Sequence, residues 1–127
     1  MNYYERALAL KEETIAHRRF FHVNAEVGLN MPIAQAYIIK TLQAYGVDAQ
    51  PCGHGVSATI GCGGKVLLLR ADMDALPMKE ESGEAFASTN GAAHCCGHDF
   101  HAAMLLTAAK MLKENEASLA GTIKLMF

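Results

Sequence analysis

The sequence predicts an α/β protein, in which a sheet carries helices on its faces in three layers. The opening part of the chain is rich in helix-forming residues, whereas from Val47 onward short β-type runs alternate with glycine turns. The run from Val66 to Leu69 is apolar at consecutive positions, which predicts a central strand covered on both faces, as in an α/β sheet. The chain has 127 residues, which fits one domain with its own core.

The first expected helix runs from about Tyr3 to His22. It contains many Ala, Leu, Glu, Lys and Arg residues and no Gly or Pro that would interrupt it. Arg18 and Arg19 lie near its carboxyl end, where cations offset the helix dipole. From this place His22 could reach an active site, or it could face solvent or cap helix carbonyls, and both interpretations stay open.

A second helix is expected after a polar break over residues 24–30. Pro32 occupies a first-turn position, which suits its fixed backbone, and Gly46 supplies the stop. One face of this helix is apolar, and we interpret it as core packing. The residues on that face are Ala34, Ile38, Leu42 and Tyr45.

Three short strands are expected over Val47 to Gln50, Val56 to Ile60 and Lys65 to Arg70, separated by glycine-containing turns. The Gly-rich turn before Lys65 lacks the Lys-Ser/Thr ending of a phosphate-binding loop, and no helix follows it. We therefore expect a tight hairpin turn at this place.

Composition and charge exclude several functional classes. The formal net charge is −2, so no basic field is present that would recruit nucleic acid or an anionic membrane. No apolar run is long enough to span a bilayer and the N-terminus does not resemble a signal peptide, so we expect a cytoplasmic protein. The four cysteines could form two disulfides, but in a reducing compartment free thiols or metal ligands are favoured.

The segment 94–101, which reads HCCGHDFH, contains two thiols, three imidazoles and a carboxylate. Cys96 and His98 are two residues apart, so in an extended segment both side chains leave on the same face. A thiolate beside an imidazole suits zinc, manganese, cobalt or nickel. A chance cluster of buried side chains is the alternative, but three histidines in so short a segment are hard to explain as core filling.

Asp72 and Asp74 follow the predicted strand at its carboxyl end, where open α/β sheets bind ligands. They alternate with apolar residues, so both carboxylates should point the same way, and like charges that close require a cation or a donor between them. Turn chemistry, or pairing with Arg70, would explain them without any function. Together with the Cys/His segment, the pair is a plausible second half of one metal site.

The remaining part of the chain frames these motifs. Residues Lys79 to Gly91 are polar with little periodicity and are expected to form a loop across the mouth of the site. Asp99 is expected to be the N-cap of a helix that ends near Glu114, and Gly121 to Phe127 should form another buried strand. The apolar stripe of that helix consists of Met104, Leu105, Ala108, Met111 and Leu112.

Two motifs carry a close family resemblance. Segment 70–77 reads RADMDALP and segment 94–106 reads HCCGHDFHAAMLL. Together they resemble the motifs of the metal-dependent amidohydrolases that cleave N-acyl amino acids, such as hippurate hydrolases, indole-acetyl-amino-acid hydrolases and N-acetyl-diaminopimelate deacetylases. The resemblance extends over nearly the whole chain. The residues that are similar to the family's N-terminal signature are Arg18, Arg19, His22, Glu26 and Gly28.

This resemblance implies a two-metal centre that holds divalent ions such as Mn, Zn, Co or Ni. The cysteine and second histidine of the family's Cys-Gly-His motif are metal ligands, and Cys96 and His98 match them. Asp74 resembles the Asp that steadies a metal-bound histidine in related peptidases, which makes it the candidate catalytic residue. The departures from the family's pattern, none of which removes a ligand, are Ala25, Met31, Ala93 and Cys95.

The function implied is hydrolysis of the amide bond of a small N-acyl amino acid, with an acetyl, benzoyl or similar acyl group. Residues 1–127 match the N-terminal part of a dinuclear-metal peptidase-like catalytic domain, and the lid or dimerisation domain is not reached. The family's general base and remaining ligands follow later than Phe127, so the chain alone is expected to be inactive, and the complete enzyme to be a homo-oligomer. The alternative is a non-catalytic metal-binding or oligomerisation module derived from this fold.

Overall fold

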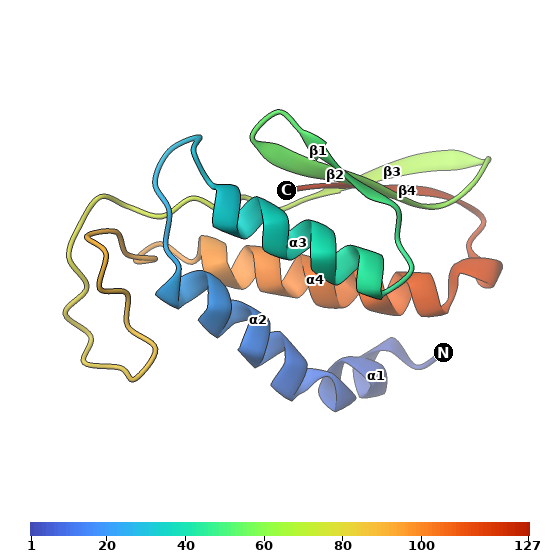
Figure 1. The fold of residues 1–127 in the computed structure, drawn as a ribbon. Helices are drawn as coiled ribbons and strands as arrows, with labels where there is room; N and C mark the ends of the chain where they lie inside the picture. The colour runs from blue at the N-terminus through green and yellow to red at the C-terminus, as the bar shows by residue number, and fades with distance from the viewer.

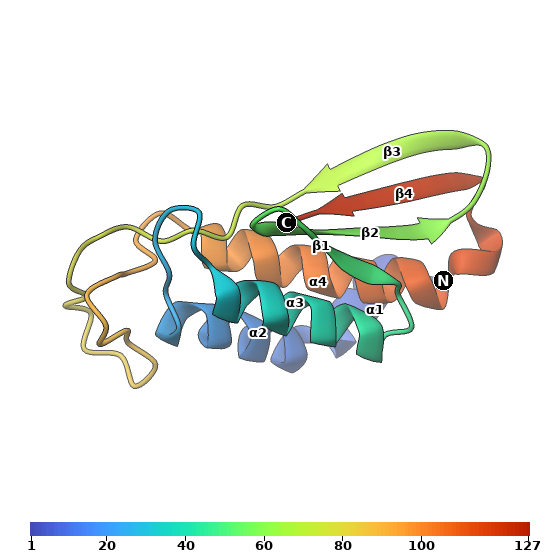
Figure 2. The same ribbon diagram turned by 45° about the horizontal axis from the view of Figure 1, so that its top comes forward.

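A computed structural model describes the whole chain, residues 1–127. It contains one four-stranded sheet, and Figures 1 and 2 show the helices packed together against one face of it. The predicted α/β class is confirmed, and the helices that a third layer requires are not among the elements of this chain. The elements are α1 (Tyr3–Ala9), α2 (Lys11–Val23), α3 (Pro32–Ala44), β1 (Ala49–Cys52), β2 (Gly55–Gly61), β3 (Lys65–Arg70), α4 (His98–Glu114), η1 (Glu116–Ser118) and β4 (Gly121–Met126).

The strand order in the sheet is β1-β2-β4-β3. β3 and β4 are parallel and are joined through α4, whereas β2 is antiparallel to both β1 and β4. The expected hairpin between β2 and β3 is wrong, because β4 lies between them. Glycines make this insertion possible: a Cβ on Gly121 would lie 2.3 Å from the backbone oxygen of Lys65, and one on Gly64 would lie 2.4 Å from that of Ala120.

β3 is an edge strand, which corrects the expectation of a central strand covered on both faces. It pairs with β4 on one side only, and its side chains at Val66, Leu67 and Leu68 are 65%, 55% and 53% exposed. The helices do not cover this edge of the sheet, so among the apolar residues of β3 only the last, Leu69, packs against the core. The apolar run thus correctly predicted a strand. Whether the faces of that strand are buried depends on the elements that pack against it, which the run itself does not specify.

The core lies between the sheet and α3 and α4, and α2 packs mainly against α4 and contributes Phe21. The predicted stripe of α3 is confirmed at its buried positions, and Tyr45 lies half-buried just beyond the helix, where its hydroxyl donates a 2.5 Å hydrogen bond to Glu13. On α4 the predicted stripe is mostly wrong: only Leu105 is buried, Leu112 packs partly buried against the core, and Met104 is 54% exposed. The buried face of α4 instead carries Ala102, Ala103, Leu106 and Ala109. The largest fully buried apolar side chains are Phe21, Ile38, Leu42, Ile60, Leu106, Leu125, Val47 and Val56.

The single helix expected from Tyr3 to His22 is in fact two, α1 and α2, which meet at Leu10. Leu10 is buried, and no Gly or Pro marks the break. Arg6 of α1 forms a bidentate pair with Glu114 at the end of α4, with distances of 2.8 and 2.6 Å. Tertiary contacts therefore bend a segment whose local propensity favours one continuous helix.

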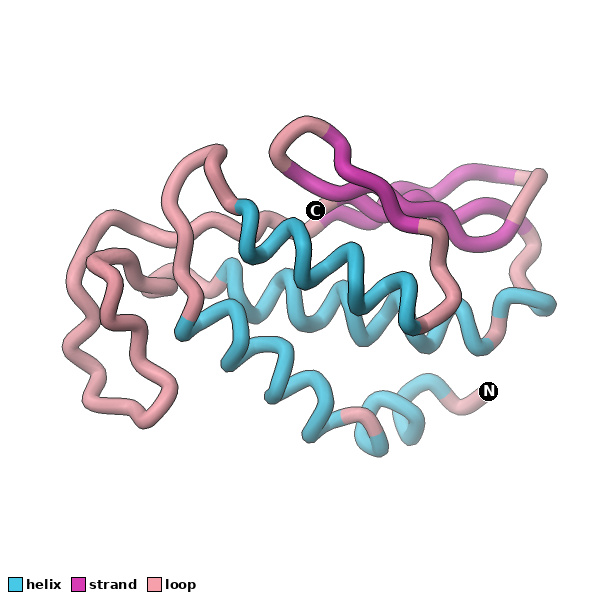
Figure 3. The backbone as a smooth tube through the Cα atoms, viewed as in Figure 1, coloured by secondary structure: helices cyan, strands magenta, loops and turns pink.

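Figure 3 shows the long irregular segments of the chain gathered at one end of the molecule. The carboxyl ends of α2 and β3 and the first turn of α4 all reach this end. α4 begins at His98 after Gly97, which has a φ of +125°, so Gly97 rather than Asp99 is the N-cap residue. None of the helices is both long and apolar enough to cross a membrane.

Candidate metal centre

His98 is the residue on which the two predicted motifs converge. Its Nδ1 lies 2.9 Å from Asp74 Oδ1 and 3.0 Å from the Asp74 backbone oxygen. Both of these atoms can only accept, so Nδ1 carries the proton and donates it, and Nε2 is the nitrogen left for a ligand. A carboxylate that orients a histidine in this way is the usual support of a metal ligand.

Asp72 faces the other side of His98. Its Oδ2 lies 3.3 Å from His98 Nε2, and its Oδ1 lies 2.6 Å from His101 Nδ1. The potential ligand atoms of these three residues all lie within 4.8 Å of one another. Partial burial raises the pKa of Asp72, but the hydrogen bond from His101 and the positive charges nearby outweigh it and hold that pKa below its usual value.

Cys96, the other predicted ligand, is exposed on the turn before α4. Its sulfur does not belong to the group formed by Asp72, His98 and His101. Cys95 is exposed as well, and all four cysteines are free thiols. The structure thus brings Asp74 and His98 together and leaves Cys96 beside them as an accessible thiol.

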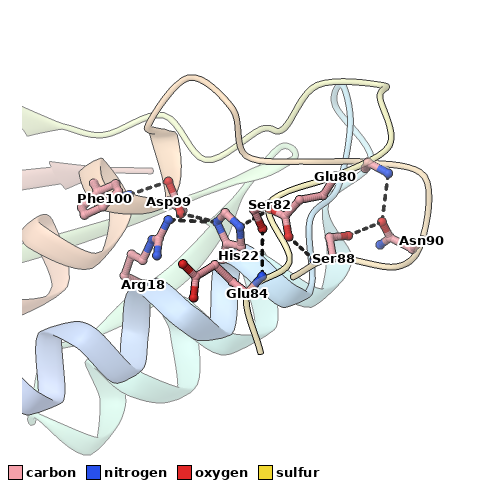
Figure 4. Close-up of polar contacts among 10 residues, drawn as sticks. Arg18, His22, Glu80, Ser82, Glu84, Ser88, Asn90, Asp99 and Phe100 are labelled. Carbon is pink, nitrogen blue, oxygen red and sulfur yellow. Dashed lines mark hydrogen bonds and ion pairs between the residues drawn. The ribbon is translucent and has the colours of Figure 1, made fainter. Parts of the chain in front are cut away.

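A second polar cluster lies on the buried side of the same helix turn, around His22 (Figure 4). His22 Nδ1 lies 2.8 Å from Asp99 Oδ2, to which Arg18 Nε also donates at 2.7 Å. The other ring nitrogen contacts Glu80, whose second oxygen accepts a 2.8 Å hydrogen bond from the backbone of Ser88. Figure 4 shows His22 between these two carboxylates, joining α2, α4 and the loop over residues 79–91.

His94 is buried next to this cluster, and its Nδ1 has no hydrogen-bond partner. Its ring centroid lies 6.2 Å from that of His22. Burial lowers the pKa of His94, and this effect outweighs the opposing influence of Asp99. Burial at this position thus favours the neutral form of the ring.

Three residues of these clusters make contacts that the sequence analysis does not predict. His101 has a local signal, because His98 and His101 are three residues apart and share one helix face. Asp99 was assigned to capping, although it is buried and bonded to α2. Glu80 sits in a polar loop and has no local signal of its burial, since its partner His22 lies 58 residues away.

The two glutamates after the Cys/His segment lie far from the candidate centre. Glu114 ends α4 and is paired with Arg6, and Glu116 bonds to Lys113 and to the backbone of Gly61. Both carboxylates belong to structural contacts at the opposite end of the helix. Neither is placed to act on a group held at Asp72 and His98.

Comparisons with known proteins agree with the predicted family. The model of peptidase family M20/M25/M40 matches residues 68–127. An N-acetyl-L-cysteine deacetylase of Bacillus subtilis is 42% identical over 123 residues, which are 93% of this chain and 30% of that protein. A solved B. subtilis structure, described as a dinuclear metal binding peptidase from the M20 family, has a TM-score of 0.89 at 33% identity and covers 94% of this chain and 35% of that chain.

The chain is therefore similar to peptidase family M20/M25/M40 from residue 68 onward. The resemblance predicted from its motifs is therefore confirmed. An N-acyl-L-amino acid amidohydrolase of Geobacillus stearothermophilus is also similar, with 37% identity over 93% of this chain and 33% of its own length. The chain thus spans about a third of the length of the curated relatives that it matches.

Proposed function

We propose that the chain supplies part of a two-metal active site that hydrolyses the amide bond of N-acyl amino acids. Residues 1–127 are then the N-terminal part of the catalytic domain. The observation that carries this proposal is the orientation of His98 by Asp74 at the carboxyl end of β3. The printed functions of the relatives, a deacetylase and an amidohydrolase, support the reaction class.

The donors at this end fit divalent metal ions. His98 offers Nε2 with its other nitrogen already engaged, and Cys96 offers an exposed thiol two residues before it. In the proposal Cys96 and His98 are ligands, and Asp74 is the residue that holds the imidazole in place. When bound, the metal pair polarises the amide carbonyl and activates a water molecule. Imidazole and thiolate donors suit Zn, Co or Ni, and the carboxylates suit Mn.

The general base is expected elsewhere in the complete protein. A base must come within about 3 Å of its water molecule, or reach it through one bridging water. Glu80 is bonded at both oxygens, and Glu114 and Glu116 lie at the far end of α4. In the proposal the chain by itself therefore binds and positions the metal, and the rest of the protein supplies the proton transfer.

The test is an activity assay on an N-acetyl amino acid, with added Mn²⁺ or Zn²⁺, for the 127-residue chain and for a longer protein that continues past Phe127. We expect metal-dependent release of the amino acid from the longer protein alone, and its loss in the Asp74→Ala variant. Turnover by the 127-residue chain that disappears in Cys96→Ala would contradict the assignment of the base. A longer protein that binds metal without hydrolysis would support a non-catalytic metal-binding module instead.

The proposal also includes the cellular location and the partners of the protein. Four exposed cysteines without a disulfide suit the reducing cytoplasm. The free edge of β3, with its exposed apolar side chains, favours further pairing within the complete enzyme or with another copy. The partner in the reaction is a small N-acyl amino acid, with the complete enzyme acting as a homo-oligomer.

A further inference from the structure

Two electron-rich atoms face each other across the exposed side of α4. The proton of His98 is fixed on Nδ1 by two acceptors of Asp74, so in the neutral ring Nε2 carries a lone pair. That lone pair faces Asp72 Oδ2 at 3.3 Å. A divalent ion placed between these two atoms would have one donor from each of the two motifs.

A second imidazole, that of His101, lies next to this pair. Its Nδ1 is hydrogen-bonded at 2.6 Å to the other oxygen of the Asp72 carboxylate. The two rings stack with centroids 5.5 Å apart, because they are three residues apart on the first turn of α4. Two imidazoles on the first turn of α4 and one carboxylate from the segment after β3 are a ligand set that binds zinc and similar metals and leaves a position open.

The group is also accessible. Asp72 and His101 line an open hollow together with Leu69, Arg70 and Met104, so an ion can enter from solvent. The competing partner of Asp72 is Arg70, which is 3.5 Å away and has a side chain that is 63% exposed. A solvent-exposed pair of this kind contributes little, so it does not hold Asp72 away from an ion.

We propose that Asp72 and His101 are metal ligands beside His98, so that this chain holds one divalent ion without any other part of the protein. The inference rests on the proposed function for the role of His98, and it adds two ligands to the predicted Cys96–His98 pair. The two assignments can be distinguished by measurement. In the present one the ion is bound by an oxygen of Asp72 and by nitrogens of His98 and His101, whether or not the sulfur of Cys96 takes part.

The experiment is a metal titration of the 127-residue chain with Zn²⁺ by calorimetry, and with Co²⁺ by absorption. Asp72→Asn and His101→Gln should each weaken binding by at least about tenfold. Asp48→Asn, an exposed carboxylate before β1, is the matched control and should bind as the wild type does. A sulfur-to-cobalt charge-transfer band, compared between wild type and Cys96→Ser, reports separately whether the thiol is a ligand.

The outcomes separate the two assignments. If Asp72→Asn and His101→Gln bind with wild-type affinity while Cys96→Ser does not, the inference is wrong and the Cys96–His98 pair stands. If the first two lose affinity and Cys96→Ser keeps it, the inference holds without the thiol. A wild-type chain that binds neither ion contradicts both assignments. Thermal unfolding of each variant identifies a folding defect, and His101→Gln, at a half-exposed position, decides the question if Asp72→Asn does not fold.

Discussion

Two clusters of histidines and carboxylates flank the first turn of α4, and they differ in burial rather than in composition. Around His22, the side chains of His22, Asp99 and Glu80 are 6%, 1% and 5% exposed. Around His98, the side chains of Asp72, His98 and His101 are 22%, 23% and 49% exposed. In the buried cluster both imidazole nitrogens of His22 are hydrogen-bonded to carboxylates, whereas in the open cluster His98 Nε2 lies 3.3 Å from the Asp72 carboxylate without a hydrogen bond.

This difference separates structural roles from binding roles. In the buried cluster Arg18 and the carboxylates of Asp99 and Glu80 are held by hydrogen bonds within the cluster, so removing one partner leaves a buried charge without it. In the open cluster water can solvate the charged groups that remain when one side chain is removed. Such a substitution therefore changes the free energy of unfolding little, but it removes a metal donor. We therefore expect substitutions in the first cluster to change the free energy of unfolding, and those in the second to change metal affinity.

The largest effect is expected for Asp99→Ala. This substitution leaves Arg18 and His22 without their shared buried carboxylate, and the free energy of unfolding should fall by about 3 kcal/mol. Chemical denaturation measures the change. Asp72→Ala is the matched control and should lower the free energy of unfolding by less than about 1 kcal/mol. Equal losses in the two variants would remove the distinction between the clusters.

A smaller effect should divide the roles of the two nitrogens of His22. Gln can place its amide near Nε2 and keep the contact to Glu80, while Asn can place its amide near Nδ1 and keep the contact to Asp99. His22→Gln loses the contact to Asp99, but Asp99 keeps its hydrogen bond from Arg18, so the free energy of unfolding should fall by about 1 kcal/mol. His22→Asn loses the contact to Glu80 instead, and the free energy of unfolding should fall by more.

His22→Asn should also release the loop over residues 79–91, which Glu80 anchors, and limited proteolysis should cut that loop faster than in His22→Gln. If both variants are cut at the wild-type rate, the contact between His22 and Glu80 does not hold the loop.

The smallest effect is a pH dependence at another buried histidine, His17, whose nitrogens each lie 2.8 Å from a tyrosine hydroxyl, of Tyr37 and of Tyr45. Burial lowers the pKa of His17 below 6.5, and the charge of Glu13 opposes this only in part. As pH falls below about 6.5, the unfolded chain therefore takes up a proton before the folded chain does, and stability is lost. Between pH 7 and pH 5 the melting temperature should fall more steeply in the wild type than in His17→Gln. Parallel slopes would show that His17 titrates alike in both states.

Local signals in the sequence predicted much of this molecule. Pro32 marks the first residue of α3, and Lys65 to Arg70 are the exact bounds of β3, because both depend on neighbouring residues. That the Asp motif and the Cys/His motif meet followed from placing one at a strand end and the other before a helix, whereas the pairing of Asp74 with His98 was implied by the family resemblance. Apart from that pairing, these predictions used only periodicity, turn residues and the known geometry of α/β sheets.

Contacts between distant segments could not be predicted in the same way. The position of β3 at the sheet edge depends on β4, which comes more than fifty residues later in the chain. The burial of Glu80 depends on His22, and nothing in the polar loop around it indicates a closed environment. Such features arise from tertiary packing, which overrides the local pattern.

The most direct test of the account is anomalous X-ray scattering at the zinc edge from crystals of the chain soaked in Zn²⁺. We predict a peak about 2.0–2.2 Å from His98 Nε2 and an oxygen of Asp72, with His101 as a further ligand, and no peak between His22 and Glu80. A peak in the buried cluster around His22, or none at His98, would contradict the claim that burial separates the structural cluster from the metal-binding one.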